Sequence, residues 1–135
     1  MNYYAVLDTN VIVSAMLKGS SIPGIIVDKA IDGNIIPVLS SEIIAEYKDV
    51  LKRKKFSFPE NDVDILIKQL SLRAIFLDRT KTDEIFADSD DAVFYEVTMT
   101  AREMSDTFLI TGNQKHFPLK TFVVTPREML DIIGE

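Results

Sequence analysis

The chain has 135 residues, of which 47% are hydrophobic and 27% charged, with only five glycines and five prolines. These values are typical of one soluble globular domain over residues 1–135 and exclude a long disordered linker. The absence of cysteine excludes disulfides, thiolate nucleophiles and cysteine-based zinc sites. The net charge of −6 argues against a passive nucleic-acid coat, but it allows an acidic cleft that a metal ion neutralises.

The expected location follows from what the chain lacks. Residues 1–4 have neither the basic start nor the apolar stretch of a secretory signal. No apolar run approaches the roughly 18 residues that a membrane span needs. We therefore expect a cytoplasmic protein with no membrane partner.

Short apolar segments alternate with segments of helical period along the chain. Strands are predicted at residues 3–7, 35–39, 75–77, 107–111 and 122–124. Helices are predicted at residues 11–17, 22–31, 62–72 and 90–103, and a last helix after Thr125. Another helix, the third in chain order, is predicted from Ser40 or Ser41 to about Lys55. This alternation predicts an α/β fold with a mainly parallel sheet covered on both faces. Active sites of such folds gather at the carboxyl ends of the strands.

Asp8 follows the first predicted strand, so its carboxylate should lie at the rim of the sheet. Aspartate is also a preferred helix cap, and capping explains this residue equally well when it is taken alone. Thr9 and Asn10 are good capping residues too, which would leave Asp8 free.

Glu46 flanks the buried stripe of the third predicted helix, three residues after Ile43 and four before Val50. A carboxylate there could reach a cleft between the helix and the sheet edge. Taken alone, a solvated helix glutamate is the favoured interpretation.

Asp88, Asp90 and Asp91 form the densest acidic segment, at the start of a predicted helix. The helix dipole is a sufficient explanation for one or two of these acids. Three acids within four residues repel one another, however, and that suggests a bound cation. Asp91 is followed by apolar residues, so we expect it in the first turn, pointing along the cleft.

Thr111, Gly112 and Asn113 end the fourth predicted strand. The amide oxygen of Asn113 could bind a metal or could cap the turn, and both interpretations stay open. His116 is the only histidine, and no serine or cysteine motif accompanies it, so a catalytic triad is not supported. We expect His116 to pack or to form a hydrogen bond within the turn at residues 112–118.

Several of these segments occur in the order and spacing of a known family. They are residues 7–11, the helix with Glu46, residues 88–94, residues 109–113 with 116–118, and residues 124–128. With them the chain resembles PIN-domain proteins, and more closely the toxin components of toxin–antitoxin systems, over nearly its whole length. The resemblance implies a three-layer α/β/α sandwich and Mg²⁺- or Mn²⁺-dependent endoribonuclease activity, as in VapC-type toxins. It also implies RNA as substrate, an antitoxin protein as partner, and a homodimer.

The resemblance also assigns roles to residues. The family's first three acidic positions fall on Asp8, Glu46 and Asp91, with Asp90 as a second claimant for the third. The fourth position, commonly aspartate, falls on Asn113, which lowers the negative charge of the site by one and bears on whether a second metal is held.

Metal-assisted cleavage explains why these residue types would be needed. A divalent ion lowers the pKa of its bound water and clamps phosphate oxygens. Asp8 and Asp91 would be direct ligands, and Glu46 a ligand directly or through water. Thr9, Asn10 and Thr111 could position waters or phosphate oxygens.

One basic run could guide RNA despite the acidic total. It follows Glu46 in the predicted helix and consists of Lys52, Arg53, Lys54 and Lys55. The alternative is a solvated helix C-terminus, where cations are favoured in any case.

Two other functions compete with the nuclease. A PIN-like module that binds RNA or protein with weak or no catalysis is the main rival, and Asn113 would mark the loss of activity. A phosphatase of the haloacid dehalogenase type is less well supported, because residues 8–10 lack the second aspartate of its nucleophile loop.

Overall fold

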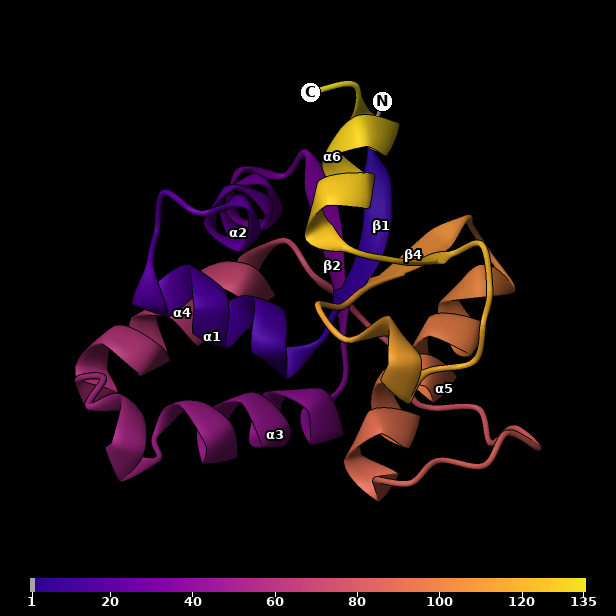
Figure 1. The fold of residues 1–135 in the computed structure, drawn as a ribbon, viewed down its shortest axis with the longest axis horizontal. Helices are drawn as coiled ribbons and strands as arrows, with labels where there is room; N and C mark the ends of the chain where they lie inside the picture. Colours follow the sequence, from indigo (N-terminus) through magenta and orange to yellow (C-terminus); the bar gives the residue numbers. More distant parts are fainter. Residues whose placement is uncertain (1) are drawn as a thin grey trace.

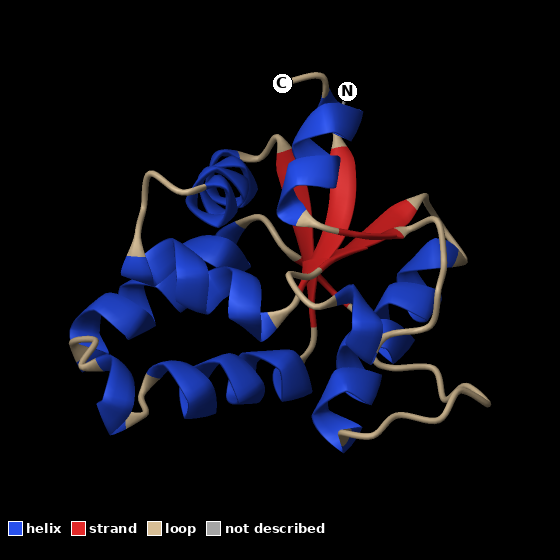
Figure 2. Cartoon of the chain, viewed as in Figure 1, coloured by secondary structure: helices blue, strands red, loops and turns tan. Residues whose placement is uncertain are grey.

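The computed structural model describes residues 2–135; Met1, the first residue of the predicted domain, lies outside the described residues. Five parallel strands form one sheet in the order β3-β2-β1-β4-β5. The strands are β1 (Tyr3–Leu7), β2 (Ile35–Leu39), β3 (Ile75–Phe76), β4 (Thr107–Ile110) and β5 (Val123–Val124). The prediction of an α/β fold with a parallel sheet is therefore confirmed, and β1 occupies its centre (Figures 1 and 2).

The helices cover both faces of this sheet. They are α1 (Thr9–Leu17), α2 (Ile22–Asp32), α3 (Ser41–Leu51), α4 (Glu60–Leu72), α5 (Ser89–Arg102) and α6 (Pro126–Ile133). Figure 1 shows α1, α2, α4 and α6 on one side of the sheet and α5 on the other. From β1 to β3 the chain adds strands on one side of β1, and α5 then returns it to the other side, where β4 pairs with β1. Because crossovers between parallel strands are right-handed, this change of direction places α5 on the opposite face of the sheet. The expected three layers are present.

The register of the central strands brings the ends of β1 and β4 together. Leu7 pairs with Ile110, and the backbone N–H of Asp8 donates to the carbonyl of Ile110 at 2.9 Å. Asp8 and Thr111 therefore leave the sheet side by side at its carboxyl edge. The strands beneath them are almost wholly buried, which makes this edge a firm support for side chains.

The third helix is shorter than predicted. It ends at Leu51, and a short 3₁₀ helix, Lys54–Phe56, follows. Arg53 between them has extended backbone angles (φ −65°, ψ 137°), so the chain changes direction there. The rings of Phe56 and Phe58 stack at 5.4 Å in the segment that leads into α4, and Phe58 packs against the core, which accounts for the early end.

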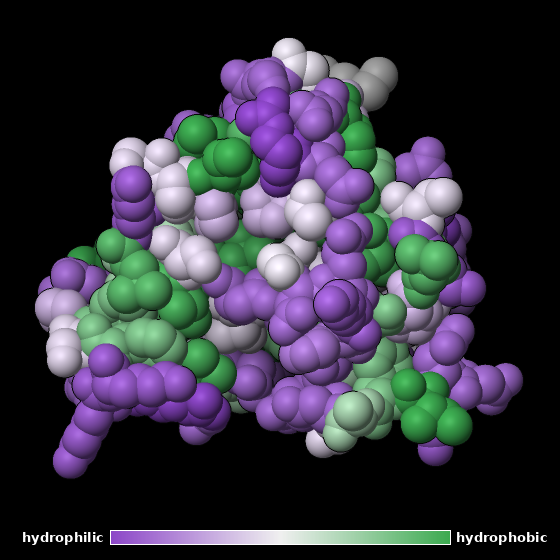
Figure 3. All heavy atoms as spheres, in the orientation of Figure 1, coloured by the Kyte–Doolittle hydropathy of each residue, from purple (hydrophilic) through white to green (hydrophobic). Residues whose placement is uncertain are grey.

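Apolar side chains also reach the surface. In the view of Figure 3 they gather over α1 and α4, whose most exposed large apolar residues are Leu17, Ile65 and Leu72. Among residues 2–135, no single helix has the length and apolarity of a membrane span; only the sharply bent pair α1 and α2 would meet the requirement in combination.

Candidate active site

Asp8 lies at the N-cap position of α1, yet its carboxylate is engaged elsewhere. Its Oδ2 accepts a 2.7 Å hydrogen bond from the buried hydroxyl of Thr111. Asp8 is 6% exposed, and burial raises the pKa of its carboxyl group, while the bond from Thr111, the Thr9 backbone and nearby His116 act in the opposite direction. The carboxylate is therefore buried at the end of the strand and does not cap the helix.

Asp91 approaches the same edge from the start of α5. The capping role belongs to Asp88, whose Oδ1 accepts from the backbone N–H of Asp90 at 2.9 Å. Asp91 lies in the first turn, as predicted, with its Oδ2 3.6 Å from Nδ1 of His116. Burial, and then the negative charges of Asp8 and Asp88, raise the pKa of Asp91 to about 6. The structure therefore brings Asp8 and Asp91 close enough to repel each other.

Glu46 lies on α3, near three further acids. Burial and then the charges of Asp90, Asp49 and Asp88 raise the pKa of Glu46, while Arg53 lowers it. The helix is held against the sheet by the next residue, Tyr47, whose hydroxyl donates to the carbonyl of Leu7 at 2.6 Å. Glu46 is partly exposed, and it lies near enough to the start of α5 for Asp90 and Asp88 to raise its pKa.

The loop after β4 completes the rim. Thr111 Oγ1, which donates to Asp8, also accepts from the backbone N–H of Asn113 at 3.0 Å. The side-chain amide of Asn113 lies 3.1 Å from Nε2 of His116. His116 thus forms a contact within its turn, as predicted, and its contact with Asp91 was not foreseen. Asn10 supports the same loop, because its Oδ1 accepts from Gly112 N at 3.2 Å.

Comparison with known families decides the assignment of this arrangement. A family model described as "PIN domain" matches residues 4–115, which is most of the chain. The chain belongs to the PIN-domain family. A solved structure, "Structure of the PIN domain endonuclease Utp24", shares 15% identity and a TM-score of 0.47, with 84% of this chain and 73% of that chain covered. The comparison with curated proteins gave no match.

PIN domains typically use divalent metals, and the donors of this PIN domain suit a hard cation in part. Its carboxylates are the oxygen ligands that Mg²⁺ prefers, and Asp8 and Asp91 repel each other, which a cation would relieve. Within residues 2–135, however, no three histidine or acidic side chains are placed to hold one ion together. Two neighbouring carboxylates are a donor set that Mg²⁺ accepts when it keeps several of its waters.

The hydroxyl of Thr9, beside Asp8, is a further polar group at this edge. It is buried and has no hydrogen-bond partner among the described residues. Buried hydroxyls without a hydrogen-bond partner are uncommon, so Thr9 is the position at this edge whose hydrogen-bonding capacity is left unused.

The basic run of this PIN domain lies beyond the end of α3, and not on the helix as predicted. Lys52 Nζ lies 2.9 Å from Asp64, and Arg53 Nη2 lies 3.1 Å from Asp49, so both cations already have acidic neighbours. Arg53 is nevertheless near enough to Glu46 to lower its pKa. Lys54 and Lys55 are exposed.

A cleft opens beside Asp91 on the side away from Glu46's helix. Its volume is about 390 Å³, and Asp91 and His116 are among the residues that line it. Its other walls combine aromatic and charged side chains, among them Phe86, Phe117 and Lys115.

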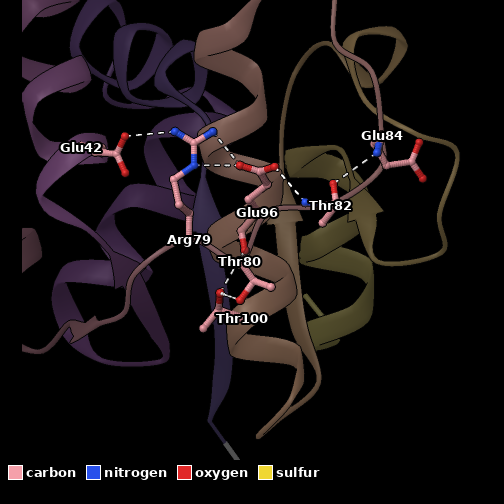
Figure 4. A network of polar contacts seen from close by, with 7 residues as sticks. All are labelled: Glu42, Arg79, Thr80, Thr82, Glu84, Glu96 and Thr100. Carbon is pink, nitrogen blue, oxygen red and sulfur yellow. Dashed lines mark hydrogen bonds and ion pairs between the residues drawn. The ribbon is translucent and has the colours of Figure 1, made fainter.

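Sequence reasoning missed a second polar network, which is drawn in Figure 4. Its centre is Glu96, which is 4% exposed and lies one and a half turns beyond Asp91 on α5. Arg79 contacts both Glu96 and Glu42, and thereby links α5 to α3. A charged residue in the buried stripe of a helix was the one signal that could have drawn attention to Glu96.

Proposed function

We propose that this PIN domain is a Mg²⁺- or Mn²⁺-dependent endoribonuclease. The observation that carries the proposal is the meeting of Asp8 and Asp91 at the carboxyl edge of the sheet, where burial and then the negative charge of Asp8 raise the pKa of Asp91 to about 6. Carboxylates that destabilise one another in this way favour a cation between them. When bound, the ion would supply an activated water and neutralise charge on the phosphate.

The chain's own residues would have distinct tasks in that reaction. Asp8 and Asp91 would hold the ion directly, and Glu46 would hold a water on the side of Asp90. Thr111 would keep the Asp8 carboxylate in one orientation through its hydrogen bond, as the loop in turn keeps Thr111 in place. His116, beside Asp91, would meet the substrate where the cleft begins. Asn113 supports His116 in this arrangement, in place of serving as a fourth acid.

The rival is a PIN-like module that binds RNA or protein with little or no catalysis. One observation favours it, namely that no three ligating side chains converge within the described chain. Cleavage of a panel of single-stranded and structured RNAs, with and without Mn²⁺, separates the two. We expect metal-dependent cleavage by the wild type, its loss in D8N and D91N, and its retention in D28N, a control on the exposed face of α2. Metal-independent binding without cleavage would establish the rival.

The biological role that we propose is that of a cytoplasmic toxin paired with an antitoxin protein. It rests on the resemblance of the chain to VapC-like toxins. Expression of the wild type should arrest growth while D8N should not, because D8N loses cleavage although its surface is almost unchanged, Asp8 being buried. Equal growth of the two strains would contradict the toxin role while leaving the nuclease intact.

We also propose a homodimer, for which the exposed apolar residues of α1 and α4 are the surface to test (Figure 3). Leu17→Ser and Leu72→Ser should shift the sedimenting species toward a monomer. A wild type that sediments as a monomer at all concentrations would exclude the dimer.

A further inference from the structure

Arg79 joins the two helices that carry the candidate carboxylates. Its Nε and Nη2 lie 2.7 and 2.6 Å from Oε1 of Glu96 on α5. Its Nη1 lies 3.1 Å from Oε2 of Glu42 on α3. Figure 4 shows the guanidinium group between the two acids, with each helix contributing one carboxylate.

The contact of Arg79 with Glu96 on α5 is held in place by further hydrogen bonds. Glu96 is buried, and its second oxygen, Oε2, accepts from the backbone N–H of Thr82 at 3.1 Å. The segment that carries Arg79 is attached to α5 once more, because the hydroxyls of Thr80 and Thr100 lie 2.6 Å apart. A planar guanidinium with a fixed fork of donors cannot rotate without breaking one of these bonds.

The two acids that Arg79 contacts, Glu42 and Glu96, lie on the helices that carry Glu46 and Asp91. Glu46 lies one helical turn after Glu42, and hence on the same side of α3. Asp91 and Asp90 lie at the start of the helix that carries Glu96. The charges of Asp90 and Asp88 raise the pKa of Glu46, so the two helices repel each other at the rim. The Arg79 bridge opposes that repulsion, and so does the hydrogen bond from Tyr47 that holds α3 to the sheet.

We propose that Arg79 is a positioning residue that fixes α3 against the start of α5 and so keeps Glu46 within reach of an ion held by Asp8 and Asp91. The inference rests on the proposed metal-dependent function and deepens it. Arg79 itself does not touch the ion or the substrate.

If Arg79 acted only through its charge, Arg79→Met would change the affinity for Mn²⁺ in the opposite direction from the one expected for a positioning residue, which makes the proposal testable. Removal of a cation near an acidic site strengthens binding of Mn²⁺ if charge alone matters. Loss of a positioning contact weakens it, and supporting contacts of metal sites are typically worth about tenfold or more in affinity. Arg79→Lys keeps the charge but cannot span two carboxylates, so it too should bind Mn²⁺ more weakly than the wild type.

The experiment measures the Kd for Mn²⁺ alone by the electron paramagnetic resonance of the free ion. Wild type, R79M, R79K and the control R127M are compared at a temperature at which circular dichroism shows all four to be folded. Arg127 is a matched control, since it pairs with Asp131 on α6, away from the site. We expect about tenfold weaker binding in R79M, a smaller loss in R79K and no change in R127M.

A second measurement follows the geometry without metal. The natural chain has no cysteine, so Ala45→Cys on α3 and Glu103→Cys at the end of α5 give two unique, exposed positions for spin labels. We expect R79M to broaden the distance distribution between them, and R127M to leave it unchanged.

The outcomes separate this inference from the proposed function. If the wild type binds Mn²⁺ and R79M binds it equally or more tightly, Arg79 is not a positioning residue, although the nuclease proposal stands. Weaker binding with an unchanged distance distribution would also overturn the inference. If the wild type binds no Mn²⁺, the metal-dependent function fails, and the spin labels alone decide whether Arg79 fixes the two helices.

Discussion

The hydroxyl of Thr111 donates a 2.7 Å hydrogen bond to Oδ2 of Asp8 and thereby joins the ends of β4 and β1, 103 positions apart in the chain. The same oxygen accepts from the N–H of Asn113, so one buried atom orients both the candidate metal ligand and the loop after β4. Chains of hydrogen bonds of this kind keep a ligand in one orientation before any ion arrives.

Thr111→Val should therefore damage both stability and function. The substitution preserves the shape of the side chain but leaves the Asp8 carboxylate without its buried donor, at a cost of about 1 to 3 kcal/mol. We expect a lower free energy of unfolding in urea and slower RNA cleavage. Thr111→Ser keeps the hydroxyl and is the control; equal losses in the two variants would show that methyl packing, and not the hydrogen bond, is what matters.

The stability of the metal-free protein should fall as the pH rises from about 4 to above 6. The pKa of Asp91 is raised from 3.8 to about 6, so the folded protein binds this proton more tightly than the unfolded chain does. The destabilisation is absent below the unfolded pKa and complete above the folded one. Because Asp91 is partly solvated, we expect an effect of about 1 kcal/mol after screening.

Asp91→Asn is the variant that checks this pH dependence. Thermal unfolding in the presence of a chelator should show a flatter profile between pH 4 and 7 for D91N than for the wild type. A wild-type profile that rises over this range would mean that other carboxylates dominate.

Added Mg²⁺ or Mn²⁺ should raise the Tm of the wild type, because an ion that binds only the folded state stabilises it by mass action. The increase should be much smaller in D8N, which lacks one of the two closest carboxylates. D28N serves as the control for loss of a surface charge. Equal increases in wild type and D8N would remove Asp8 from the metal site.

Loss of Arg79 should also destabilise the fold. Arg79→Met leaves the buried Glu96 carboxylate without its cation, which is costly even though the arginine is partly exposed; we expect about 2 kcal/mol. Arg127→Met, which breaks an exposed pair, should cost under about 0.5 kcal/mol. Urea unfolding measures both, and the double variant R79M with Glu96→Gln should recover part of the loss. No recovery would mean that the pair does not account for it.

Charge reversal at Lys52 and Arg53 tests the proposed path of RNA. These residues lie just beyond α3, and Arg53 is close to Glu46. K52E with R53E should weaken RNA binding and reduce its salt dependence, since fewer counterions are then released. Lys68→Glu on the exposed face of α4 is the control. If both proteins bind RNA as the wild type does, the basic run is only a solvated helix end whose charges pair with Asp64 and Asp49.

The positions of the strands and most helices could be predicted from local pattern, and the end of α3 could not. Residues 52–55 favour a helix by themselves, but the chain leaves the helix at Leu51 and Phe58 packs against the core before α4 begins. Helix propensity is a weak preference, of a few tenths of a kcal/mol per residue, and tertiary packing overrides it.

The candidate site was predictable to a similar degree. Asp8 and Asp91 could be singled out because each sits where a periodic segment begins or ends. Arg79 could not, since the irregular segment at 77–88 has no period from which to infer its partners. The contact of His116 with Asp91 was equally hidden, because it joins the short 3₁₀ helix after β4 to the first turn of α5, and their approach depends on how α5 packs.

The amino-acid sequence by itself determined the α/β class, the order of the elements and the presence of acids at their ends, because these follow from periodicity and residue type within short stretches. Only the tertiary structure decided that Asp8 meets Thr111 and Asp91, whereas Glu46 faces Asp90 and Arg79 spans two helices. Those distances depend on how parallel strands align and how helices pack over them, and no local pattern encodes such long-range geometry.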